Sequence, residues 1–357
     1  MPGEAKLARA GTPAGAAAFV LTRLNLTLPS LQSIIAAARN LAVVAICLGL
    51  WMAFQRRDRD SLRLWAAMTV VVPVTYLLGF GFFSYGFMAI AVVTGFWLSV
   101  PRPGKKTKEL LQICLVLAGI YVSLSIFVTY MEVRNSLRDV LWDSDARLSE
   151  RISIVVTELA KARPFNPFDF RQLDWVNIRL NQNMLIGKAM WLHEIAPYLR
   201  ENGLAFLASL FAWVPRFLWP SKPGMGGNDF VGKHTDMSFS DGTTIGAGPV
   251  FELFVNFGLI GVFLGSIVFG WILRWMDVYC ARQLHRRDIG RFIRGYLVSV
   301  CLINPMSLIF FLVSSATASW IIGSGIMFVL DRTRKRDRRL RPPVRGGPET
   351  EKQIWAS

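Results

Sequence analysis

The stretch that decides the fold is GPVFELFVNFGLIGVFLGSIVFGWIL, which runs from Gly248 to Leu273. Its only charged residue is Glu252. About 20 apolar residues in a helix cross a hydrocarbon core of about 30 Å, so this stretch is long enough to span a bilayer. Because lipid offers no hydrogen-bond partners, a spanning segment must satisfy its own backbone groups and therefore forms a helix. The stretch predicts a transmembrane helix.

Other apolar blocks lie on both sides of it, and 53% of all residues are hydrophobic. A first span is predicted over Ser33 to Phe54 and another over Leu110 to Met131. The blocks 64–100 and 296–330 are too long for one span each, and we expect each to form a hairpin of two. A turn near Gly79 to Gly86 divides the first block, and Pro305 lies in the second. The sequence therefore predicts an all-α integral membrane protein with about seven transmembrane helices and one large loop that contains amphipathic helices.

Basic residues in the short connections predict the orientation of these spans. The segments 55–63, 101–109 and 274–294 and the tail 331–357 are rich in arginine and lysine, and such segments stay on the cytoplasmic side. All four lie on that side if the spans alternate. We therefore expect four domains: spans in 1–131, an exported loop at 132–247, spans in 248–330 and a basic cytoplasmic tail at 331–357. The N-terminus then begins outside, which fits a missing first helix.

The charge and the motif content exclude several classes of protein. A net charge of +16 would suggest nucleic acid in a soluble protein, but here basic loops that orient the helices and contact anionic lipid explain it. We predict membrane lipids as partners and no nucleic acid. The cysteines and histidines show no metal-ligand spacing, and no phosphate-binding or dinucleotide glycine motif occurs. We therefore expect neither a metal nor a cofactor.

The first part of the exported loop predicts two amphipathic helices that lie along the membrane surface, over 149–162 and 175–200. Prolines at 164 and 167 separate them. Arg179 is one of several cations on these helices. These cations either face water and lipid or contact a substrate. His193 is interpreted as an interfacial residue.

The second part of the loop contains WVPRFLWPSKPG, from Trp213 to Gly224. Its three prolines prevent a helix and stiffen the chain, and Trp219 is typical of the membrane interface. This turn holds Arg216 and Lys222 near the headgroup level. An arginine fork binds phosphate oxygens in pairs and a lysine adds a point charge, so the two cations either bind a diphosphate or anchor the turn to anionic lipid.

Further polar candidates follow in a segment rich in Gly, Ser and Thr that is able to approach a sugar closely. Lys233 and His234 lie there, and His234 is the only histidine near the cations of the loop. Glu252 and Asn256 are four residues apart and so share a helix face. An acid at the mouth of a transmembrane helix is a functional candidate, but a helix N-terminus also favours negative charge for structural reasons. Both interpretations of Glu252 stay open.

Three of these segments resemble bacterial O-antigen polymerases. They are Pro215 to Pro223, Thr243 to Gly246, and Glu252 to Gly261, which reads ELFVNFGLIG. The family has a Pro-Arg-x-x-Trp-Pro-x-Lys-Pro turn, a Thr/Ser-rich loop and a helix that opens Glu-x-x-x-Asn-Phe-Gly-x-x-Gly. The resemblance covers roughly residues 211–275. Its members usually have more spans than seven, so we expect a truncated N-terminus or a shortened relative.

The resemblance implies a glycosyltransferase of the bacterial inner membrane, with a periplasmic loop and a cytoplasmic C-terminus. Such an enzyme polymerises oligosaccharide repeat units carried on undecaprenyl diphosphate, beside a chain-length regulator and a flippase. Cations would stabilise the departing diphosphate, and a base would take the proton of the acceptor hydroxyl. The resemblance then assigns Arg216 to catalysis, with Glu252, His234 and Asp236 as candidate bases. The predicted substrate-binding residues are Lys222, Lys233, Asn256, Arg179 and Trp219.

Two other functions remain open. An O-antigen ligase uses the same donor but a lipid A-core acceptor, and a non-catalytic subunit would serve as a membrane scaffold of a polysaccharide export complex. Arg216 discriminates the enzyme from the scaffold. A polymerase needs its charge and planar fork, whereas a scaffold should tolerate glutamine there.

Overall fold

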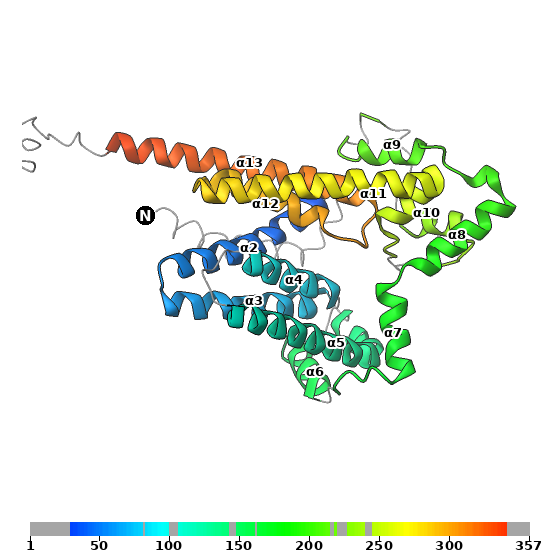
Figure 1. Cartoon of the computed structure of the whole chain (residues 1–357), viewed down its shortest axis with the longest axis horizontal. Coiled ribbons are helices and arrows are strands. Elements are labelled where there is room, and N and C mark those ends of the chain that lie inside the picture. Colours follow the sequence, from blue (N-terminus) through cyan, green and yellow to red (C-terminus); the bar gives the residue numbers. More distant parts are fainter. Residues whose placement is uncertain are drawn as a thin grey trace, which may run out of the picture.

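The computed structural model describes residues 29–80, 83–99, 106–142, 148–160, 163–214, 218–219, 227–239 and 245–340. Within these ranges every regular element is a helix (Figure 1). The all-α prediction is therefore confirmed for the part of the chain that the structure describes.

Seven helices occupy the segments in which seven spans were predicted. They are α2 (Pro29–Gln55), α3 (Arg59–Phe80), α4 (Phe83–Ser99), α5 (Lys106–Trp142), α11 (Gly248–His285), α12 (Ile289–Leu302) and α13 (Ile309–Leu340). Three described stretches are long and apolar enough to cross a membrane: Val116–Arg134, Gly248–His285 and Ile309–Val329. Asn40–Gln55 and Gly86–Ser99 are apolar but shorter. The helices support a membrane protein with at least these three candidate spans.

The helix α12 differs from the prediction. It begins at Ile289, includes Arg291 and Arg294, and ends at Leu302, so only its last turns lie in the uncharged block. Its 14 residues extend about 21 Å, which is shorter than a hydrocarbon core. The helices α12 and α13 pack closely as a helical hairpin whose turn contains Pro305, but α12 is not among the candidate spans. The uncharged block 296–330 therefore contains the end of a short helix, a turn and part of α13.

A first hydrophobic cluster, which we call the bundle core, joins α2, α4 and α12. Its buried residues include Ile46 and Val44 of α2, Phe96 of α4, and Phe292 and Leu297 of α12. The rings of Phe96 and Phe292 lie 6.1 Å apart between centroids. The bundle core holds the N-terminal and C-terminal halves of the chain together.

A second cluster, the cap core, surrounds the start of α11. It includes residues of α8 (Asn183–Ile195), α9 (Leu204–Leu210) and α10 (Asn228–Thr235), together with Phe251 and Val255 of α11. In Figure 1 these short helices gather at one end of the molecule, around the end of α11. The polar candidates that the structure describes in α10 and α11 therefore lie in or beside the cap core.

The helix α11 changes its surroundings at Gly258. This glycine has φ 66° and ψ −159° inside the helix and produces a kink. Residues 251–256 before the kink are all buried, whereas Leu259, Ile260 and Phe263 after it are between 63% and 74% exposed. The kink thus separates an end that packs in the cap core from an apolar shaft that faces outward.

The loop helices agree only partly with the sequence. The helix predicted over 149–162 is α6 (Leu148–Ala160). The helix predicted over 175–200 is instead three pieces, α7 (Phe170–Leu180), α8 and the 3-10 turn η1 (Pro197–Leu199). The helix α7 ends before Asn181, whose backbone is extended at φ −105°. The backbone N–H of Asn181 donates to Asn177 O. The helix α7 begins at Phe170, five residues before the predicted start, and its N-cap is Asp169, whose side chain accepts the N–H of Arg171.

Candidate functional site

The structure describes the predicted site residues unevenly. Arg216 and Lys222 lie outside the described residues, as does the side chain of Arg179 on α7. Trp219 is half-buried and packs against the cap core. Lys233 and His234 lie on α10, and Asp236 ends that helix with an exposed side chain and a left-handed φ of 53°. Glu252 and Asn256 lie in the buried first turns of α11.

Glu252 joins three helices through its carboxylate. The Ser209 hydroxyl of α9 donates to Oε1, and the Ile309 backbone N–H donates to Oε2 at 2.7 Å. Ile309 is the first residue of α13, where the helix dipole favours a negative charge. Only 2% of Glu252 is exposed. These contacts fit the structural interpretation of Glu252, although the helix N-terminus that it satisfies belongs to α13 and not to its own helix.

Asn256 caps α9 from outside that helix. The Asn256 carbonyl accepts the N–H of Phe206 at 3.0 Å, and its amide donates to Glu252 O at 2.8 Å. Phe206 lies in the first turn of α9, where N–H groups have no partner within the helix. The N-cap residue Gly203 has no side chain to serve them. Asn256 therefore fixes the position of α9 over α11.

The histidines of α8 and α10 form a buried pair. His193 Nε2 lies 3.0 Å from His234 Nδ1, and the exposed fractions are 2% and 0%. The interpretation of His193 as an interfacial residue is therefore wrong. Leu185, Ala189 and His193 follow one another at intervals of four residues and form the buried face of α8. That spacing was the signal in the sequence that predicts the burial of His193.

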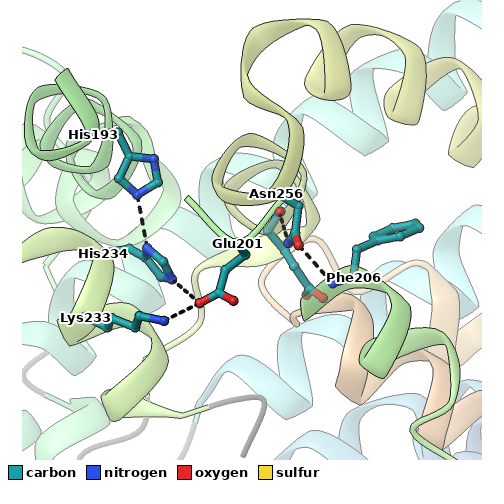
Figure 2. A network of polar contacts seen from close by, with 7 residues as sticks. His193, Glu201, Phe206, Lys233, His234 and Asn256 are labelled. Atoms are coloured by element: carbon teal, nitrogen blue, oxygen red, sulfur yellow. Dashed lines mark hydrogen bonds and ion pairs between the residues drawn. The ribbon is translucent and has the colours of Figure 1, made fainter. Parts of the chain in front are cut away.

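Glu201 completes this polar cluster, which Figure 2 shows. Lys233 Nζ lies 2.5 Å from Glu201 Oε1, and His234 Nε2 lies 3.3 Å from the same oxygen. The second contact lacks the alignment of a hydrogen bond, which leaves His234 Nε2 buried without a hydrogen-bond partner. Glu201 is outside the segments of the family resemblance and follows no periodic pattern, so sequence reasoning missed it.

Burial determines the protonation of the two histidines. Desolvation lowers the pKa of His234 to about 4, and Glu201 opposes this shift. Desolvation and the positive charge of Arg200 lower the pKa of His193. Both imidazoles are therefore neutral at neutral pH, and one of the two facing nitrogens carries the hydrogen that they share.

The cluster of His193, His234, Glu201 and Lys233 combines a proton acceptor with a cation at one place. Among the described residues no group of three or more His, Cys, Asp or Glu side chains is arranged to hold a metal ion. The side chains of the cluster are themselves able to accept a proton and to stabilise a negative charge. Comparisons with protein-family models, with curated proteins and with solved structures found no match to this chain.

Proposed function

We propose that this protein is a membrane glycosyltransferase that polymerises oligosaccharide repeat units carried on undecaprenyl diphosphate. The proposal includes about seven spans, a periplasmic loop, a cytoplasmic C-terminus and a location in the bacterial inner membrane. It rests on the resemblance to O-antigen polymerases and on one observation from the structure.

That observation is the convergence of the three resembling segments. Trp219 of the first segment, Ile245 of the second, and Phe254 and Val255 of the third all pack in or against the cap core. Trp219 precedes the other three residues by 26 or more positions in the sequence, yet it packs with them at the N-terminal end of α11. Segments that share one reaction must lie together, so this convergence supports a common site.

The arrangement suits the chemistry of the proposed reaction. The acceptor hydroxyl forms a bond to the anomeric carbon of the growing chain, and the bond from that carbon to the lipid diphosphate breaks. The leaving diphosphate carries the negative charge that develops, so cations beside it lower the barrier. Arg216 and Lys222 flank Trp219 in the sequence, and Trp219 packs at the cap core. We assign these two cations to the leaving group.

The test is a gel profile of surface polysaccharide from source cells that lack the gene. The deletion strain is complemented with the wild type, with Arg216→Gln, or with Lys188→Gln, which removes an exposed cation of α8 as a matched control. We expect deletion to reduce the ladder to single repeat units, and only the wild type and the control to restore it. An unchanged ladder in the deletion strain would contradict the proposal.

The same profile separates the alternatives. A ligase would leave long chains on the carrier lipid while none reaches the lipid A-core. A scaffold would let Arg216→Gln restore the ladder as well as the wild type does.

A further inference from the structure

We infer that Glu201 is the general base of the proposed reaction and that Lys233 and His234 hold its carboxylate in place. This inference rests on the proposed function, and it names a catalytic residue outside the segments that resemble the polymerase family.

The backbone places Glu201 at the site. Its N–H donates to Val255 O at 3.3 Å, so Glu201 is attached to the first turns of α11. Val255 belongs to the third resembling segment, and Asn256 beside it caps α9, which begins three residues after Glu201. Glu201 therefore lies where the cap core meets the resembling segments.

Exposure distinguishes Glu201 from the buried members of the cluster. Its side chain is 18% exposed, whereas His234 is fully buried and Glu252 is 2% exposed. A base must reach the proton that it takes, which favours a carboxylate that is open to solvent over a fully enclosed one. Glu252 also has each of its oxygens engaged as a hydrogen-bond acceptor. Within the described residues, Glu201 is the carboxylate that both belongs to the buried cluster and reaches the surface.

In the described part of the chain, the side-chain contacts of Glu201 are made through one of its two carboxylate oxygens. Lys233 and His234 both approach Oε1. Among the described residues none bonds to Oε2 through its side chain or backbone. Because both neighbours approach Oε1, Oε2 is the carboxylate oxygen that a substrate hydroxyl is able to approach. Oε2 is therefore the atom that we assign to the acceptor hydroxyl.

The buried histidines explain why this carboxylate stays in place. His234 Nε2 is buried without a hydrogen-bond partner and lies 3.3 Å from Oε1. A buried polar atom left unpaired is costly, and the Glu201 carboxylate is the acceptor that lies beside it. His193 Nε2 contacts the other ring nitrogen of His234, Nδ1, at 3.0 Å. We infer that His193 positions His234 and that His234 positions the Glu201 carboxylate. In other enzymes a further residue orients the catalytic base in the same way.

The proton and the charges balance in this step. The hydroxyl proton passes to Glu201 Oε2 while the hydroxyl oxygen bonds to the anomeric carbon. The bond between that carbon and the diphosphate oxygen breaks, and the diphosphate leaves with the electron pair. Glu201 then releases the proton to water through its exposed edge. No other reactant is consumed.

The test uses membranes that contain the full-length protein, with lipid-linked single repeat units extracted from the deletion strain as substrate. Glu201→Gln keeps the shape of the side chain but cannot take a proton. We expect kcat to fall by about 10²–10⁴-fold, the usual contribution of a general base, with KM nearly unchanged. The matched control is Glu194→Gln, an exposed carboxylate of α8, which should retain the wild-type rate.

Each outcome decides one question. Full activity of Glu201→Gln, with an active wild type, overturns the inference and leaves the proposed function intact. An inactive wild type overturns the proposed function and the inference with it. If Glu201→Gln does not accumulate, Glu201→Asp replaces it, because this variant keeps the charge but withdraws the carboxylate by one methylene. A lower kcat per folded Glu201→Asp protein supports the inference, and a wild-type kcat overturns it.

Discussion

Glu252 has a carboxylate in the interior of the molecule, and its partners account for that position. Moving a charge out of water is costly unless hydrogen bonds replace the lost hydration. The Ser209 hydroxyl, the Ile309 N–H and the dipole of α13 provide this compensation. Glu252 therefore joins α9, α11 and α13, and its removal should weaken the packing of all three helices.

The first prediction concerns this junction. Glu252→Ala leaves two donors without acceptors, and each unpaired buried donor costs about 1–3 kcal/mol, so the free energy of unfolding should fall by about 2–6 kcal/mol. Ser209→Ala removes one donor and leaves the Ile309 contact, and it should cost less. Thermal unfolding of the purified protein in detergent measures both. A wild-type melting temperature for Glu252→Ala would contradict the junction.

The second prediction concerns the histidine pair. An unfolded histidine has a pKa near 6.5, and burial lowers that of His234 to about 4. Between these values the unfolded chain binds more protons than the folded one, so stability falls as the pH falls from about 6.5 to about 4. Besides the two histidines themselves, the charged or titratable groups that act on the pair are Arg200, Glu201 and Lys233.

This effect should reach about 3 kcal/mol for His234. Melting temperatures at pH 7 and pH 4.5 measure it, with His234→Asn as the variant that cannot titrate. The wild type should lose more stability than the variant over this range. Equal losses would mean that His234 is not the group that titrates.

At the scale of elements, the kink of α11 depends on one residue. The backbone of Gly258, with φ 66° and ψ −159°, lies in a region that only glycine adopts without strain. A Cβ added there would meet no atom within 4 Å, so any cost of a side chain comes from backbone strain. The glycine allows the buried end of α11 to turn into the cap core while the shaft keeps its own direction.

The third prediction follows from this strain. Gly258→Ala should lower the free energy of unfolding by about 1–3 kcal/mol and speed amide exchange in residues 248–257. Gly270→Ala is the matched control, because Gly270 lies in the same helix in open space. Alanine is the better helix former, so this control should be neutral or stabilising by up to about 1 kcal/mol. A straight, fully protected α11 in Gly258→Ala would contradict the role of the kink.

At the scale of the whole molecule, the two hydrophobic cores hold different sets of helices together. The bundle core joins the long helices, and the cap core gathers the short loop helices at the end of α11 (Figure 1). The outward faces of the long helices are apolar, as Phe263, Ile267 and Trp271 of α11 illustrate. Large apolar side chains on that scale fit contact with lipid.

The fourth prediction concerns orientation. The proposal places α8 outside the cytoplasm and the turn between α11 and α12 inside it. A membrane-impermeant thiol reagent should therefore label Glu194→Cys in intact cells, and label Arg286→Cys only after permeabilisation. Both positions are exposed, and the background carries Cys114→Ser because Cys114 is the exposed one of the four cysteines. The reverse pattern of labelling would invert the proposed topology.

Much of the fold could be predicted because the relevant signals are local. An uncharged run such as 110–131 predicts a helix wherever it lies, since its backbone must bond internally in lipid. The same reasoning was wrong about the extent of α12, because an uncharged run shows neither where a helix ends nor where a turn interrupts it. The continuous helix predicted over 175–200 was also wrong, because Asn181 is extended and breaks it.

The sequence by itself determined that the described chain is helical and has stretches apolar enough to span a membrane, because hydropathy and helix formation depend on neighbouring residues. Only the tertiary structure decided which polar groups meet. Glu201, His193 and His234 come from three separate segments, and Glu252 serves the N-terminus of a helix more than fifty residues away. A hydrogen bond depends on distance and direction in space, and packing, not spacing along the chain, determines both.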